Sequence, residues 1–320
     1  MKSVASFGLR IAPASLALAA LALVAQTPRE TAPQAPKPAW QSAAGGKMSF
    51  EVASVRRAEP GPFLRPSFEL GVEDSPVPPG GRFFASFALV DFVQFAYKIM
   101  PTPEQQAAML AALPQWAKTE YFVIQAEAPG NPTKDQMRLM MQALLADRFH
   151  LRAHFETRIE PVFALVLTRQ GRLGPRIRPH AEGLPCSAPW TPPADRTAPT
   201  VAPGGFTAVC GSFDGIEGPD HTFWAGARNA TLEQVADYLA WEQNLGKPVV
   251  DQTGLTGRFD FTLQFTPECT MPTAESACAV ETTGITLIEA LREQFGMKLQ
   301  PTRSPVQILV IDHVEPPTPN

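Results

Sequence analysis

Apolar and polar positions along the first part of the chain alternate in some segments and recur at helical spacing in others. Alternation predicts half-buried strands, and apolar residues three and four apart predict helices. The expected order is strand 50–55, strand 83–87, helix 88–99, a loop or short helix in 103–116, strand 121–126 and helix 137–149. Asn131 or Thr133 can cap the last helix. Strands 151–158 and 162–168 are then predicted to form a closing hairpin.

A second stretch repeats much of this pattern. The expected order is strand 223–227, helix 232–245, strand 249–251, strand 259–265, a helix ending at Gly296 and a closing hairpin of strands 298–302 and 306–314. Asn229 or Thr231 can cap the first helix, and Thr283 or Thr286 the second. Gly254 and Gly257 can adopt the positive φ of a tight turn, so strands 249–251 and 259–265 are predicted to pair as a hairpin.

The two stretches share a residue pattern as well as an order of elements. Leu145-x3-Phe149-x-Leu151 matches Leu291-x3-Phe295-x-Met297, and a Pro-Val pair follows each, at residues 161–162 and 305–306. We therefore expect an α+β protein of two related β-α-β-β-α-β-like units that arose by internal duplication, with Phe149 and Phe295 in equivalent core positions. The alternative is two independent α/β domains that share a hairpin.

The N-terminus has the pattern of a signal peptide. Lys2 and Arg10 precede an uncharged run from Ile11 to Ala25, which is shorter than the roughly 20 residues that span a bilayer. Cleavage is expected near Ala25, with Ala20-Leu21-Ala22 as a competing site, and a retained anchor as the alternative. The sequence therefore predicts a periplasmic or secreted protein with no transmembrane segment after cleavage.

Proline-rich segments divide the chain into predicted regions. These are a signal peptide at 1–25, a Pro-rich linker at 26–47, a first unit at 48–180, a disulfide-containing connection at 181–220, a second unit at 221–315 and a tail at 316–320.

The four cysteines lie downstream of the predicted signal peptide. An even number of cysteines in an exported chain favours disulfides, and order along the chain favours the local pairs Cys186–Cys210 and Cys269–Cys278. A zinc site is the alternative, but no two cysteines have the usual spacing of structural zinc ligands. We therefore predict no metal and no cofactor.

Composition limits the class of partner. The 320 residues, 44% of them hydrophobic, can bury a sizeable core. A net charge of -4 provides no basic surface for nucleic acid, so none is expected as a partner.

Four segments of the sequence carry a family resemblance: 50–55, 144–149, 248–261 and 310–315. Together they resemble a family of secreted bacterial proteins that is abundant in soil Acidobacteria and carries a domain-of-unknown-function label. The resemblance runs from about Phe50 to Glu315 and implies export and a two-part architecture, but no activity or catalytic residue. In the loop between Ile99 and Trp116 the chain departs from the usual pattern of that family.

A second resemblance rests on the helix from Leu232, the turn at Gly254 to Gly257, the segments 286–291 and 295–297, and the last strand. In these features each unit is similar to the short N-terminal domain of secretins and TonB-dependent receptors. Those domains are periplasmic modules that mediate protein contacts, so the resemblance implies a binding role.

Several polar clusters are candidates for chemistry. His150 and His154 lie near Asp147 and Glu156, but the preceding helix is expected to end at Phe149, so an ordinary polar sheet face is favoured over a metal site. Asp251 and Asp260 flank the predicted hairpin turn, where turn capping is favoured over a catalytic pair, and Asp312 is a third isolated carboxylate.

These observations favour a non-enzymatic binding module whose partner is an unidentified envelope protein or ligand. The expected contact is a free sheet edge that accepts a partner strand, with Asp260 guarding it against indiscriminate pairing. The alternative is a secreted enzyme, such as a hydrolase, with a site between the two halves. The predicted edge consists of Phe259, Asp260, Phe261, Thr262 and Leu263.

Overall fold

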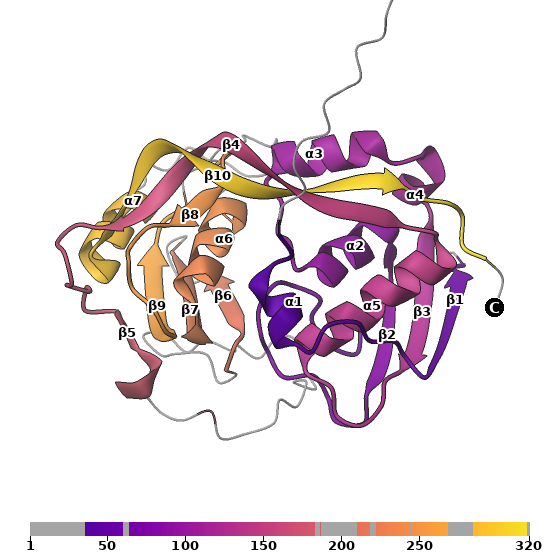
Figure 1. The fold of residues 1–320 in the computed structure, drawn as a ribbon. Coiled ribbons are helices and arrows are strands. Elements are labelled where there is room, and N and C mark those ends of the chain that lie inside the picture. The colour runs from indigo at the N-terminus through magenta and orange to yellow at the C-terminus, as the bar shows by residue number, and fades with distance from the viewer. Residues whose placement is uncertain are drawn as a thin grey trace, which may run out of the picture. The chain divides into compact units, whose positions relative to one another are not determined.

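A computed structural model describes residues 36–59, 64–182, 186, 210–217, 222–242, 245–267 and 284–318. The fold is of the mixed α+β class, with strands in three sheets (Figure 1). We call the elements from α1 to β4 the first half and those from β5 to β10 the second half. The predicted signal peptide, Cys269 and Cys278 lie outside the described residues.

The first half contains an antiparallel sheet in the order β1-β3-β2. Its buried side chains pack against helices α2 and α5, which contact each other. The elements are α1 (Ala39–Ala43), β1 (Val52–Arg57), β2 (Arg82–Ala88), α2 (Leu89–Tyr97), α3 (Pro103–Ala112), α4 (Gln115–Thr119), β3 (Tyr121–Glu127) and α5 (Lys134–Arg148).

The second half contains a sheet in the order β5-β9-β7-β6. The order β5-β9-β7 corresponds to β1-β3-β2, and β6 is an added edge strand. The elements are β5 (Ile177–Pro179), the 3-10 turn η1 (His180–Glu182), β6 (Phe213–Glu217), β7 (Phe223–Ala230), α6 (Leu232–Glu242), β9 (Phe259–Phe265) and α7 (Leu287–Ala290), which continues into a π-helical turn, η3 (Leu291–Phe295).

Two long antiparallel strands connect the halves: β4 (Arg152–Leu167) and β10 (Met297–His313). Each begins in the core of its own half and ends in the other core: Phe155 and Leu309 are buried in the first, and Leu165 and Met297 in the second. Figure 1 shows this ribbon running across both sheets. A short strand, β8 (Val249–Asp251), pairs with β4 in parallel.

The predicted closing hairpins are therefore wrong, because β4 and β10 continue through Pro161 and Pro305. The amide of Phe163 donates to the carbonyl of Pro248, and the carbonyl of Leu165 accepts from the amide of Gln252. Odd-numbered residues of β4 therefore direct their backbone groups toward β8. By strand alternation, Pro161 and Pro305 both lie at positions that direct no backbone group into the β4–β10 ladder. Proline is tolerated at such positions, so neither one forces a turn.

The predicted pairing of strands 249–251 and 259–265 is also wrong. β8 pairs with β4, whereas β9 pairs with β5 and β7 in a different sheet. Gly254 and Gly257 do have positive φ, at 72° and 101°. They turn the chain from one sheet to another, and Val249 is buried in the second core.

Helices α5, α6 and α7 begin with the same capping pattern, which decides between the alternative caps predicted for them. Thr133, Thr231 and Thr286 each accept a hydrogen bond from the amide three residues later, and the Gln or Glu side chain at that position accepts one from the threonine amide. This reciprocal capping box satisfies two helix N-terminal donors. The predicted helix end at Gly296 is confirmed, because this residue is left-handed with φ of 69°.

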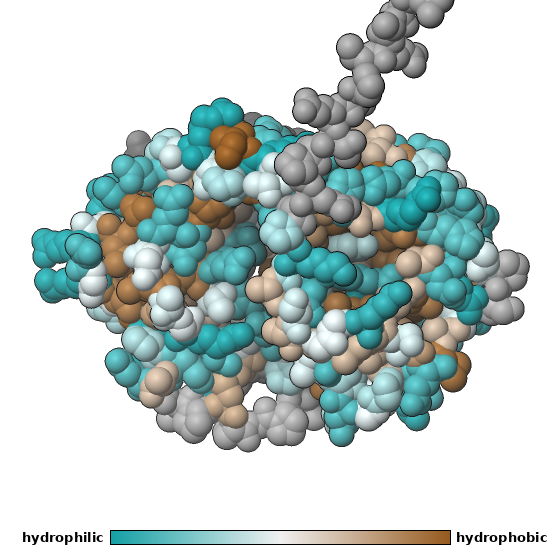
Figure 2. Space-filling view, viewed as in Figure 1, coloured by the Kyte–Doolittle hydropathy of each residue, from teal (hydrophilic) through white to brown (hydrophobic). Residues whose placement is uncertain are grey.

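Hydrophilic residues cover much of the face shown in Figure 2, with hydrophobic ones gathered in patches between them. None of the described helices combines the length and apolar character needed to cross a bilayer.

Candidate functional site

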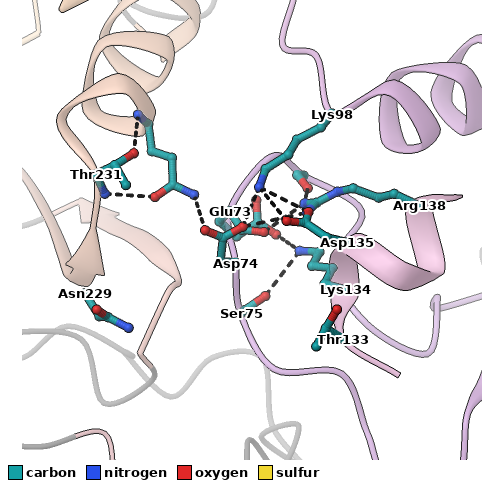
Figure 3. A network of polar contacts seen from close by, with 12 residues as sticks. Glu73, Asp74, Ser75, Lys98, Thr133, Lys134, Asp135, Arg138, Asn229 and Thr231 are labelled. Carbon is teal, nitrogen blue, oxygen red and sulfur yellow. Dashed lines mark hydrogen bonds and ion pairs between the residues drawn. The ribbon is translucent and has the colours of Figure 1, made fainter. Parts of the chain in front are cut away.

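The loop at residues 71–75 carries a carboxylate that joins the two halves. Asp74 accepts hydrogen bonds from Lys98 of the first half (2.7 Å) and from Gln234 (3.0 Å) and Arg258 (2.9 Å) of the second. In Figure 3, Asp74 lies between Lys98 and the start of α6 at Thr231. Lys98 is the left-handed C-cap of α2, with φ of 53°, and Gln234 lies in the first turn of α6. One side chain thus connects two helix ends.

Two buried cations of α5 hold the same loop from the other side. Lys134 contacts the carboxylate of Glu73 and the hydroxyl of Ser75. Arg138, which is fully buried, donates to the carbonyl oxygens of Gly71 (2.8 Å) and Glu73 (2.9 Å) and pairs with Asp135. The capping box at Thr133 fixes the start of this helix, so both cations emerge at defined positions.

Burial and pairing shift several pKa values in this network. Burial alone would raise the pKa of Asp74, but the charges and hydrogen bonds of Lys98 and Arg258 outweigh it and lower the pKa to about 2. Burial lowers the pKa of Lys134 to about 8, against the opposing charge of Glu73.

Asp237, on α6 near this network, is shifted the other way. Partial burial and the charge of Glu233 raise its pKa to about 7, although the charge of Lys98 opposes the shift. Perturbed groups of this kind occur both at active sites and in structural ion networks. Asp74, Lys134 and Arg138 all have direct partners, which is typical of a structural clamp between the halves.

Replacing Asp237 by asparagine is expected to alter the pH dependence of stability. The folded-state pKa of about 7 exceeds the unfolded value of about 3.8, so the folded state binds the extra proton between these values. The stabilisation is present below pH 3.8 and is lost as pH rises toward 7. Urea midpoints measured from pH 4 to 8 should fall with rising pH more steeply in the wild type than in Asp237→Asn. Equal slopes would contradict the shift, and Asp147→Asn, at an exposed carboxylate, is the control.

The predicted Cys186–Cys210 disulfide is confirmed, with its Cα atoms 5.6 Å apart. It joins Cys186, which follows η1, to Cys210, and Cys210 forms an isolated β-bridge with Arg228 of β7. Closure of such a loop stabilises a fold by about 3 kcal/mol.

Cys269–Cys278 lies outside the described residues and stays a prediction. Peptide mapping under non-reducing conditions is expected to recover one peptide pair for each local disulfide, because both pairs are close in sequence. A free thiol at either position, or a peptide joining Cys269 to Cys186 or Cys210, would contradict the pairing.

The predicted binding edge does not lie at an edge. Residues Phe259 to Leu263 belong to β9, which pairs with β7 on one side and with β5 on the other. The pairing continues to the residue before β5, where the carbonyl of Arg176 accepts a hydrogen bond from the amide of Thr262 at 3.0 Å. Asp260 is 1% exposed and guards no edge. The sequence pattern missed β5 because it has three residues, one of them proline.

An open hollow of about 540 Å³, with both polar and apolar walls, lies where α5, β4 and the end of β10 meet. Its Glu315 carboxylate is 2.7 Å from Nε2 of His313 and 3.8 Å from Nε2 of His150. The hydrogen bond from His313 and the nearby charges of His150, His313 and Arg152 lower the pKa of Glu315. We call this site the seam hollow; it is lined by Ala146, His150, Leu151, Arg152, His313 and Glu315.

His150 has a left-handed backbone, with φ of 50°. It follows α5, and the amide of Leu151 closes the turn by donating to the carbonyl of Leu145. Gly296 has the same place after the matching helix of the second half, with φ of 69°. A Cβ atom at Gly296 would lie 3.0 Å from the amide nitrogen of Gly174, whereas the side chain of His150 lines the hollow. The first half therefore has a histidine where glycine is the unstrained choice.

The sequence analysis placed His150 and His154 together on a polar sheet face, and the structure separates them. His150 precedes β4 and does not share a sheet face with His154, which lies 2.8 Å from Asp312 and 3.4 Å from Glu156. The convergence of His150 and Arg152 with His313 and Glu315 depends on pairing between strands far apart in the sequence. No local pattern carries that information.

A family model described as "protein of unknown function (DUF3738)" matches residues 90–314. The matched part includes α5, both long strands and all the lining residues of the seam hollow except Glu315. No curated protein and no solved structure gives a significant match to the chain.

Proposed function

The chain belongs to the family of proteins of unknown function DUF3738, and from this premise we propose that it is an exported, non-enzymatic binding module. Its ligand is an envelope molecule that presents a carboxylate or phosphate group to the seam hollow. The N-terminal pattern of Lys2, Arg10 and the apolar run to Ala25 supports a periplasmic or secreted location. The similarity of each half to periplasmic contact domains supports binding over catalysis.

The observation that carries this proposal is the histidine at a left-handed position. A residue other than glycine in this conformation costs about 1 kcal/mol or more, and such strain is concentrated at functional sites. Gly296 at the matching place shows that the same helix-to-strand turn forms without a side chain. The side chain of His150 therefore serves the hollow that it lines rather than the turn.

The lining of the hollow favours an anion. Three side chains that can carry positive charge, His150, Arg152 and His313, surround one carboxylate, Glu315. Arginine binds carboxylate and phosphate oxygens through paired N–H donors. An incoming anion takes donors that Glu315 does not occupy, and the apolar parts of Ala146 and Leu151 complete the wall.

Binding of citrate and pyrophosphate to the full chain, measured by calorimetry, tests the proposal and separates carboxylate from phosphate ligands. Arg152→Gln is expected to weaken the preferred anion about tenfold, as expected when a charged hydrogen bond is lost. Arg158→Gln, on the same strand but outside the hollow, is the matched control and should bind as the wild type does. Equal affinity in wild type and Arg152→Gln, or no binding of either anion, would contradict the proposal.

His150→Gly gives a result that distinguishes function from folding. Because glycine relieves the left-handed strain, we expect the free energy of unfolding to rise by about 1 kcal/mol. Because the imidazole is lost, anion affinity should fall at least threefold. Chemical denaturation and calorimetry on the same preparation measure both quantities. A variant that loses stability, or gains stability with unchanged affinity, would contradict a binding role for His150.

A second candidate function is an enzyme with its site between the halves, favoured by the shifted groups at that junction. Lys134, with a pKa of about 8, and Asp237, with a pKa of about 7, have values suited to proton transfer near neutral pH. Turnover of any hydrolysable substrate that disappears in both Lys134→Met and Asp237→Asn, with the fold retained, would favour this candidate over the binding module.

We also infer that the halves arose by internal duplication. Corresponding strand orders, β1-β3-β2 and β5-β9-β7, support this origin. So does the shared passage from a helix through a left-handed residue, His150 or Gly296, into a strand that crosses to the other half.

A further inference from the structure

A histidine of the second half is held between a buried carboxylate and the disulfide. His180, in η1, places Nδ1 2.6 Å from Oδ1 of Asp260 in β9. The same oxygen accepts the amide of Asn229 at 3.0 Å. Asp260 is 1% exposed, and among the described residues its other oxygen, Oδ2, is buried without a hydrogen-bond partner. This carboxylate therefore fixes the orientation of the imidazole.

The other ring nitrogen faces sulfur. Nε2 of His180 lies 3.4 Å from Sγ of Cys186, and the ligand atoms of His180, Cys186 and Cys210 all lie within 4.8 Å of one another. With Nδ1–H donated to Asp260, Nε2 presents its lone pair to the two sulfurs. Histidines that bind metals are oriented in this way, by a carboxylate on the nitrogen that does not bind.

We propose that reduction of the Cys186–Cys210 disulfide creates a site for a thiophilic divalent cation of the zinc class, with His180, Cys186 and Cys210 as ligands. In a tetrahedral site, zinc bonds of about 2.0–2.1 Å to nitrogen and 2.3 Å to sulfur place these atoms about 3.6 Å apart. The observed separation of 3.4 Å between Nε2 of His180 and Sγ of Cys186 needs little adjustment, and the two sulfurs, bonded in the disulfide, move to about 3.8 Å apart on binding. Water or a ligand group takes the fourth position.

The electron and proton balance defines two states. A dithiol reductant supplies two electrons and two protons, leaves as its own disulfide, and converts Cys186 and Cys210 to thiols. Binding of the cation then releases two thiol protons to solvent, because thiolates are the ligands. A disulfide oxidant that accepts two electrons and two protons, and leaves as its dithiol, re-forms the Cys186–Cys210 bond and expels the cation, so the disulfide and the metal site exclude each other.

Cobalt(II) and zinc(II) binding to the full chain with Cys269→Ser and Cys278→Ser tests this proposal. The reduced protein is expected to bind one cobalt ion with a thiolate-to-metal charge-transfer band, and zinc should displace it. The oxidised protein should show no such band. Asp260→Asn should weaken zinc about 10–100-fold, the usual effect of losing a carboxylate that orients a ligand histidine.

Two variants separate ligation from folding. His180→Ala should abolish the band, whereas His180→Cys should restore tight zinc binding with a third sulfur ligand, which a purely structural histidine would not allow. His154→Ala is the matched control, because its ring also lies against a carboxylate, at 2.8 Å from Asp312. Equal zinc affinity in reduced and oxidised protein, or an unchanged cobalt spectrum in His180→Ala, would overturn the proposal.

Discussion

Replacing Phe295 by alanine is expected to lower the free energy of unfolding by about 3–5 kcal/mol. The ring is fully buried at the end of the helical segment that precedes β10. It meets the ring of Phe261 in β9 edge to face, with centroids 5.1 Å apart. The substitution leaves a cavity between helix and sheet and removes this aromatic contact.

Phe149 provides the matched comparison. It is fully buried after α5 and meets Phe122 of β3 edge to face at 5.2 Å. Phe149→Ala should therefore cost a similar amount. Urea denaturation measures both, and Phe295→Leu, which keeps most of the volume, should recover more than half of the loss. A loss below about 1 kcal/mol for either alanine variant would contradict equivalent core roles.

Replacing Arg138 by alanine should also destabilise the fold by about 3–5 kcal/mol. The side chain is fully buried and pairs with Asp135, and its Nη2 satisfies the carbonyl oxygens of Gly71 and Glu73. Its removal leaves buried acceptors without donors and loosens the loop that presents Asp74 to the second half.

The measurement is the urea midpoint of unfolding together with the slope of the unfolding free energy against urea concentration. Arg148→Ala, on the same helix, removes one long hydrogen bond to the carbonyl of Ala53 (3.3 Å) and should cost clearly less than Arg138→Ala. Arg138→Met keeps the volume but not the hydrogen bonds and should recover only part of the loss. If Arg138→Met is as stable as the wild type, Arg138 stabilises the fold by filling its volume and not by its hydrogen bonds, which would contradict the prediction.

Local elements were predictable from the sequence where one physical rule dominates. Apolar spacing located α5, and threonine three residues before Gln or Glu marks the starts of α3, α5, α6 and α7, so Thr133 caps α5 rather than Asn131. Phe149 and Phe295 were placed in the core by their equivalent positions, and both are buried.

Long-range pairing was not predictable. Pro161 and Pro305 looked like turn residues because a local pattern does not show which side of a strand has a neighbour. β9 looked like an edge because β5 is too short for a periodic pattern. Asp260 was assigned to a turn or to guarding an edge, because its burial and its contact with His180 depend on the pairing of β5 with β9 in the second sheet.

The most direct test of anion binding at the seam hollow is the ring-proton NMR spectrum of the five histidines during titration with pyrophosphate and, separately, citrate. We predict saturable shifts in the signals of His150 and His313, with the signal of His180, beside Asp260 in the second sheet, unmoved, and no such shifts in Arg152→Gln. Unmoved signals from His150 and His313 at saturating concentrations of both anions, or equal shifts in all five histidines, would contradict binding at the hollow.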